Sequence, residues 1–126
     1  MPTPIKIFIG KIALRAALFD SPCAKQIIDR LPIETRPNVW GDEFYFEIPV
    51  KALLDDTATT KVKIGDIGYW PTGKALAIFF GPTPMSPGND PLPASAVNLV
   101  GRIIDDATVL RQEKGALKIR IEKDNS

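Results

Sequence analysis

The chain has 126 residues, 44% of them hydrophobic, which is the size and composition of one domain with a core of its own. Its 16 basic and 15 acidic residues leave a net charge of +1, so no charge surplus favours nucleic acid as a partner. The absence of histidine excludes Ser-His-Asp and Cys-His catalysis and HExxH zinc sites. We expect a single domain over residues 1–126, a monomer or small homo-oligomer, with no metal and no cofactor.

The single cysteine, Cys23, excludes an internal disulfide and fits a reducing compartment. Lys6, Lys11 and Arg15 interrupt the apolar residues near the N-terminus, a pattern that is not typical of a signal peptide. No apolar stretch reaches the length needed to cross a bilayer. These features predict a cytoplasmic protein with no membrane partner.

Alternation of apolar and polar residues predicts short strands that mostly form hairpins. In the segment 43–48, Phe44, Phe46 and Ile48 share one face and are expected to bind the strand to the core. The predicted strands are 5–9, 12–18, 33–40, 43–48, 66–70, 75–80, 97–104 and 117–122.

Two short helices are predicted, at about 22–31 and 106–113. Ser21 is a suitable N-cap for the first, and Asp105 or Asp106 for the second. Many short strands with so few helices favour a mainly β fold, a closed eight-stranded antiparallel barrel capped by the two helices, because closure removes unpaired strand edges.

Residues 75–80, ALAIFF, include no polar residue, so both faces of this strand should be covered, as between a barrel interior and an outer helix. The segment 81–95 carries five prolines and is predicted to be a stiff, irregular loop, either a wall of a binding site or a lid over a barrel end. Gly73 and Lys74 lack the spacing of a phosphate-binding loop and are interpreted as a hairpin turn.

Four segments resemble the cyclophilin-like proteins of prokaryotes: WGDEFYFEIPV (40–50), GDIGYWPTGKALAIFFG (65–81), PTPMS (82–86) and PASAVNLVGRI (93–103). The resemblance spans nearly the whole chain and implies a compact eight-stranded barrel closed by two helices.

True cyclophilins are prolyl isomerases whose pocket contains an arginine and a histidine, but the FHR and QGGDF-type motifs are absent here. Arg36, within ETRPNVW, lies about where the cyclophilin arginine would be expected; the competing interpretation is a solvated surface group.

The leading hypothesis is a domain that binds a peptide or small-molecule ligand between the 40–45 hairpin and the 81–95 loop, without efficient prolyl isomerase activity. The alternatives are a divergent prolyl isomerase, in which Arg36 polarises the prolyl nitrogen, and an acid–base enzyme that uses Glu43 and Glu47. Aromatic side chains dominate ligand sites, although the same side chains also fill cores. The candidate ligand-binding residues are Trp40, Glu43, Tyr45, Trp70, Phe80, Thr83, Met85 and Ser86.

Overall fold

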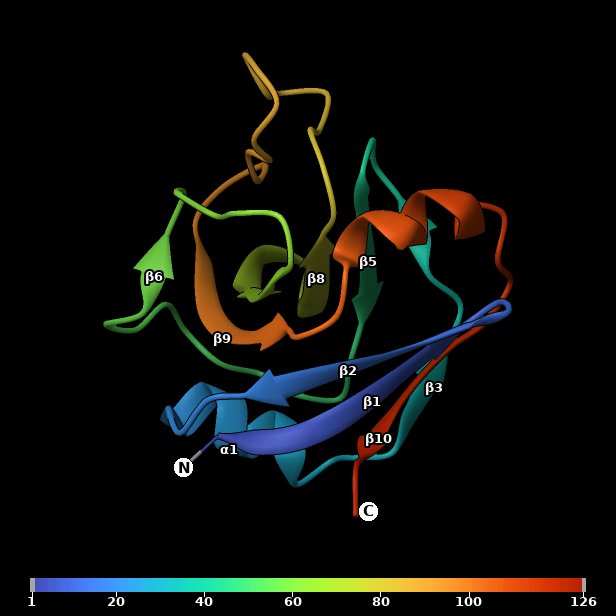
Figure 1. Ribbon diagram of the computed structural model, residues 1–126. Coiled ribbons are helices and arrows are strands. Elements are labelled where there is room, and N and C mark those ends of the chain that lie inside the picture. Colours follow the sequence, from blue (N-terminus) through green and yellow to red (C-terminus); the bar gives the residue numbers. More distant parts are fainter. Residues whose placement is uncertain (1, 126) are drawn as a thin grey trace.

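The computed structural model describes residues 2–125, and most of its regular structure is strand (Figure 1). The strands are β1 (Thr3–Ile9), β2 (Ile12–Leu18), β3 (Ile33–Thr35), β4 (Asn38–Val39), β5 (Glu43–Glu47), β6 (Ala58–Thr59), β7 (Asp66–Trp70), β8 (Ala75–Phe79), β9 (Val97–Ile103) and β10 (Ile119–Lys123). The helices are α1 (Pro22–Ile28) and the 3-10 segments η1 (Pro71–Gly73) and η2 (Ala107–Glu113).

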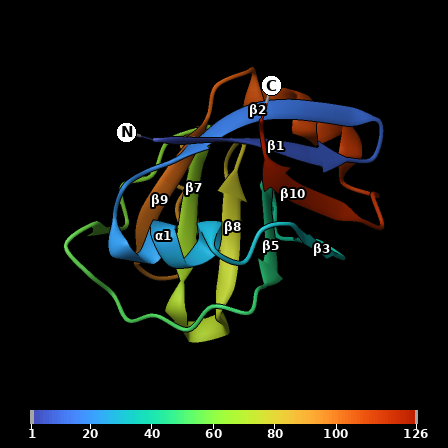
Figure 2. The ribbon, with the colours of Figure 1, turned by 90° about the horizontal axis from the view of Figure 1, so that it is seen from below.

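All of these strands belong to one antiparallel sheet, in the order β3-β10-β1-β2-β9-β7-β8-β5-β4, with β6 added beside β9. The sheet curls into a half-barrel, as Figures 1 and 2 show from two directions. The prediction of a mainly β fold is therefore confirmed.

The finer prediction of a closed barrel with eight strands is not confirmed. Residues 2–125 form ten strands, because the segment 33–40 divides into β3 and β4 and because β6 forms within the polar stretch 54–61. Pro37 lies at the division and has no backbone N–H to donate to a neighbouring strand. Within residues 2–125, β3 and β4 are the two ends of the sheet order, and no ladder joins them.

The two predicted helices are present, with one shorter than expected. The Ser21 side chain accepts a hydrogen bond from the Ala24 N–H (3.2 Å), as the N-cap assignment requires. The helix ends at Ile28 and not at residue 31. A turn follows it, and Pro32 disfavours helical geometry in Leu31, the residue before it. Asp106 caps η2 by accepting from the Thr108 N–H (3.0 Å).

Every residue of β8 is buried, so the prediction that both of its faces are covered is confirmed. Leu76 and Ile78 face the main core, while Ala77 and Phe79 belong to a smaller apolar cluster on the opposite face. The sequence predicts an outer helix over this second face, and that prediction is wrong. Among the described residues, the smaller cluster contains no residue of a helix. It is completed by Val62, Val97, Tyr45 and Trp70. Strands and loops therefore build this side of the molecule.

The long connection between β5 and β7 is anchored by a buried asparagine on β9. The Asn98 side chain accepts a hydrogen bond from the Asp55 N–H (2.9 Å) and donates one to the Leu53 carbonyl (3.0 Å). These two bonds hold residues 53–55 in place, although the side chains of Leu53 and Leu54 are exposed. The anchor fixes β9 against the connection next to Val97, which contributes to the site described below.

Candidate functional site

The turn between β4 and β5 is pinned to the start of the 81–95 loop. Gly41 adopts a φ of 62°, and a Cβ at this position would lie 2.8 Å from Pro84 Cδ, so the turn requires a glycine both for its conformation and for its close approach. The Asp42 N–H donates to the Pro82 carbonyl (2.9 Å), and the Phe80 N–H donates to the Asp42 carbonyl (2.9 Å). The hairpin and the loop are thus held beside one another by their backbones.

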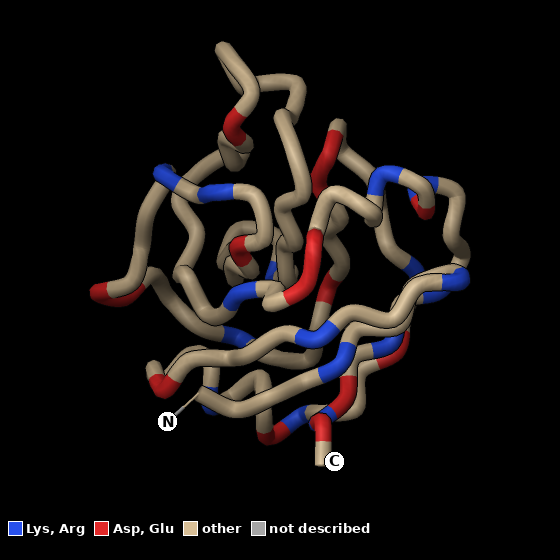
Figure 3. The backbone as a smooth tube through the Cα atoms, in the orientation of Figure 1, with Lys and Arg blue, Asp and Glu red and all other residues tan. Residues whose placement is uncertain are grey.

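The Asp42 side chain also ties this turn to η2. Its carboxylate accepts from Arg111 Nε (2.8 Å) and lies 2.6 Å from Lys114 Nζ. Figure 3 shows acidic and basic positions interspersed along the backbone. Arg111 of η2 and Lys114, which directly follows η2, are therefore both paired with Asp42.

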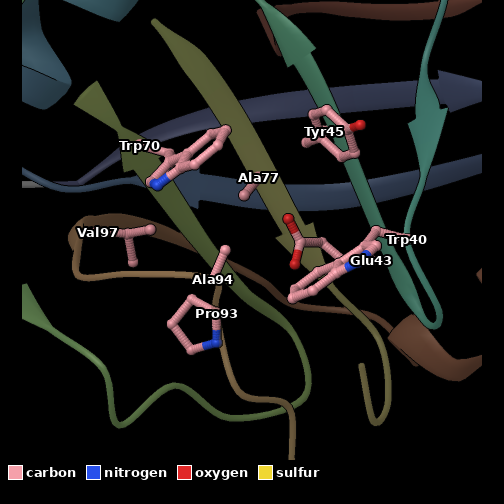
Figure 4. A pocket seen from close by; sticks show the side chains of 8 residues that line it. All are labelled: Trp40, Glu43, Tyr45, Trp70, Ala77, Pro93, Ala94 and Val97. Atoms are coloured by element: carbon pink, nitrogen blue, oxygen red, sulfur yellow. The ribbon is translucent and has the colours of Figure 1, made fainter. Parts of the chain in front are cut away.

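An apolar pocket of about 250 Å³ opens between the β4–β5 hairpin, the end of β7 and the end of the 81–95 loop (Figure 4). It lies on the smaller apolar cluster, on the face of β8 opposite the main core. This volume is below the roughly 300–1,000 Å³ of pockets for drug-sized ligands. It suits one small ring system or one side chain. The lining residues are Trp40, Glu43, Tyr45, Trp70, Ala77, Pro93, Ala94 and Val97.

Glu43 is the one acidic residue of this lining, and it is buried, with 7% of its surface exposed. Its carboxyl group points into the middle of the pocket in Figure 4, and its Oε1 atom has no hydrogen-bond partner among residues 2–125. Burial in apolar surroundings raises the pKa of Glu43 to about 8, because desolvation disfavours the charged form. This pKa favours the protonated form of the carboxyl group at neutral pH.

Two aromatic side chains flank this carboxyl group at fixed positions. The rings of Tyr45 and Trp70 meet edge to face with centroids 6.5 Å apart. The indole N–H of Trp70 donates to Ser95 Oγ (2.7 Å), so the loop end orients the ring. Trp40, the other lining tryptophan, follows β4 directly and lies below the carboxyl group in Figure 4.

The structure brings four of the eight predicted ligand-binding residues together at the pocket: Trp40, Glu43, Tyr45 and Trp70. Phe80 lies elsewhere, since it is fully buried in the main core with its ring 4.8 Å from that of Phe44. Met85 is half exposed on the loop and does not line the pocket.

Thr83 and Ser86, which the sequence predicts to bind a ligand, form hydrogen bonds within the 81–95 loop. Thr83 Oγ1 donates to the Leu92 carbonyl (2.6 Å), and the Thr83 N–H donates to Ser86 Oγ (2.9 Å). Neither side chain lines the pocket. These bonds stiffen the loop that delivers Pro93 and Ala94 to the pocket wall.

The two residues on which the alternative activities depend lie outside the pocket. Arg36 is exposed in the short link between β3 and β4 and does not belong to the lining. Glu47 is exposed at the end of β5 and does not share the pocket with Glu43. The structure therefore does not assemble the predicted arginine with the aromatic groups, nor the two carboxylates with one another.

Sequence reasoning missed four lining residues: Ala77, Pro93, Ala94 and Val97. Register offers a signal for the first, since Ala77 pairs with Tyr45 across β5 and β8, and a small side chain opposite a large one leaves space beside it. Val97 sits close to Gly68 of β7, where a Cβ would lie 2.6 Å from Val97 Cγ2.

Among residues 2–125, no three His, Cys, Asp or Glu side chains gather in a way that would hold a metal ion. The helices in the same range are all too short or too polar to cross a membrane.

The comparison with protein families is decisive for the fold. The family model described as Cyclophilin-like matches residues 3–122. The chain belongs to the cyclophilin-like family. Among solved structures, a hypothetical protein from Archaeoglobus fulgidus, determined in solution, is 32% identical with a TM-score of 0.82, over 98% of this chain and 95% of that chain. No curated protein matches. The resemblance inferred from the sequence is thereby confirmed.

Proposed function

We propose that this cyclophilin-like domain binds a small ligand, or a single side chain of a peptide, in the pocket around Glu43. The observation that carries the proposal is a buried carboxyl group, whose Oε1 atom has no hydrogen-bond partner among residues 2–125, at the centre of an apolar aromatic pocket. A buried polar group without a partner costs about 1–3 kcal/mol, and such groups require an explanation. A ligand that supplies the missing partner removes this cost.

The walls support binding for a second reason, which is their rigidity. The hairpin turn, the loop and the Trp70 ring are each held by the hydrogen bonds described above. Binding to a preformed pocket requires little ordering of side chains, so more of the contact energy contributes to affinity. Efficient prolyl isomerase activity centred on Arg36 is not part of the proposal, because this residue is exposed and outside the lining.

The chain contains only two tryptophans, and both line the pocket, so intrinsic fluorescence reports on its occupancy. Three ring compounds of one size provide the test: benzyl alcohol, benzylammonium and benzoate. We expect at least one of them to change the tryptophan fluorescence saturably. Ala94→Phe, at an exposed position on the rim, should weaken that binding at least about ten-fold, because the added phenyl ring would occupy the space that a one-ring ligand needs.

Ala13→Phe is the matched control, because Ala13 is exposed on β2 and does not line the pocket. It should bind like the unaltered chain. If none of the three compounds binds, or if both variants bind equally well, the proposed function is wrong.

A further inference from the structure

We propose that the ligand of this pocket is a small organic cation, a primary or secondary ammonium on an apolar body, with Glu43 as its counter-ion. The inference rests on the proposed function and specifies the chemical class of the ligand. It follows from what the lining residues can donate and accept.

The charge of the lining favours a cation over an anion. No lysine or arginine lines the pocket. The two basic side chains beside the hairpin turn, Arg111 and Lys114, are engaged by Asp42. An anionic ligand would find no cation in this lining to pair with, and the electron-rich faces of the aromatic rings disfavour a negative charge.

The aromatic residues supply the second contact that an ammonium group requires. Trp40 lies beside the Glu43 carboxyl group in Figure 4, and Tyr45 and Trp70 line the same pocket farther from it. A cation held within about 6 Å of an aromatic ring centre is attracted by the ring quadrupole, most strongly for tryptophan. An ammonium group that donates to the Glu43 carboxyl group would therefore lie beside these aromatic side chains.

The Glu43 carboxylate also needs hydrogen-bond donors from the ligand. The Trp70 indole N–H is already used by Ser95, so it does not satisfy Glu43. A primary or secondary ammonium brings two or three N–H donors, which meets the need of a carboxylate for more than one hydrogen bond. A quaternary ammonium has the charge without the donors and should bind less tightly.

Binding of the cation must displace the proton of Glu43, because the raised pKa favours the protonated carboxyl group at neutral pH. Within the lining, Tyr45 is the one other titratable group. The titratable groups on the elements packed around the pocket are Asp42 in the hairpin turn, Tyr45 and Glu47 on β5, Asp66 and Tyr69 on β7, Asp90 in the loop, Arg102 on β9, and Arg111, Glu113 and Lys114 at η2. Strands β4 and β8 carry none.

The affinity for a cation should accordingly rise with pH. With a pKa of about 8 for Glu43, the association constant of benzylammonium should increase roughly 50-fold between pH 6 and pH 8 and then level off. A neutral ligand that accepts a hydrogen bond from the protonated carboxyl group would behave in the opposite way, losing affinity above pH 8.

The test is a fluorescence titration with benzylammonium, benzyl alcohol and benzyltrimethylammonium at pH 6, 7 and 8, on the unaltered chain and on Glu43→Gln. Glutamine keeps the shape and the hydrogen-bonding capacity of the side chain but removes its charge. We expect benzylammonium to bind the unaltered chain at least ten-fold more tightly than either other probe at pH 8. In Glu43→Gln this preference and the pH dependence should both disappear.

Equal or tighter binding of benzyl alcohol, or an affinity for benzylammonium that does not rise with pH, would overturn the cation assignment and leave the proposed binding function intact. Failure of every probe would remove both. Nα-acetyl-lysine methylamide, as a fourth probe, distinguishes the source of the ammonium: tighter binding than benzylammonium indicates a lysine carried on a peptide, and weaker binding indicates a free amine.

Discussion

Glu43→Gln is expected to stabilise the folded chain at pH 9 by about 3–5 kcal/mol relative to the unaltered protein, because it removes a carboxylate that ionises in an apolar pocket. Folding raises the pKa of Glu43 from an ordinary 4.5 to about 8. Between these two pH values the unfolded chain has lost the proton and the folded chain retains it. The contribution of Glu43 to stability is therefore complete below pH 4.5 and falls as the pH rises to about 8.

Urea denaturation at pH 5, 7 and 9 measures this effect as a difference between the two proteins. The unaltered chain should lose stability over the range relative to Glu43→Gln. Burial also raises the pKa values of the Cys23 thiol and the Tyr69 hydroxyl, but these contributions are common to both proteins and cancel. Glu47→Gln is the matched control, since Glu47 is exposed on the same face of β5, and it should follow the unaltered chain. Parallel pH profiles for the unaltered chain and Glu43→Gln would contradict the account.

Phe44→Ala should destabilise the protein by about 3–5 kcal/mol, because it empties a fully buried site in the main core. The Phe44 ring packs against Phe80 at 4.8 Å between centroids and secures β5, the strand that carries Glu43. Its neighbour Tyr45 points to the pocket and is only partly buried. Tyr45→Ala should therefore cost much less stability.

The two neighbouring substitutions are best compared by urea denaturation at pH 5, where Glu43 is protonated in the folded chain. Tyr45→Ala should still fold and should lose affinity for benzylammonium, since one wall of the pocket is gone. Equal losses of stability in the two variants would show that the two faces of β5 are not divided between core and pocket as described.

Local signals in the sequence were sufficient for the elements that build the site. The alternation Glu43-Phe44-Tyr45-Phe46 correctly assigns the core face of β5. The turn at Lys74 was also predicted correctly: its φ of 49° and the hydrogen bond from its N–H to the Pro71 carbonyl (3.1 Å) close the connection between β7 and β8. These features depend on residues that are neighbours along the chain.

Features that depend on distant contacts could not be predicted in the same way. Glu43 is a candidate ligand-binding residue in the sequence, but its burial depends on pocket walls that come from distant segments of the chain. Phe80 resembles a binding aromatic in the sequence, but the pleat of its strand directs it to the main core. Closure of the barrel was inferred from the number of strands, whereas the sheet order is decided by long-range pairing, such as that of β10 with β1 and β3.

The most direct test of the account is the titration of the Glu43 side chain itself. The chemical shift of its carboxyl carbon, followed by NMR from pH 3 to pH 10 on a ¹³C-labelled sample and assigned with Glu43→Gln, gives the pKa without reference to any ligand. The account predicts a midpoint near pH 8, which benzylammonium lowers. A midpoint near the ordinary value of 4.5 would mean that water or a partner reaches the carboxyl group, and it would contradict the description of the pocket on which the proposed function depends.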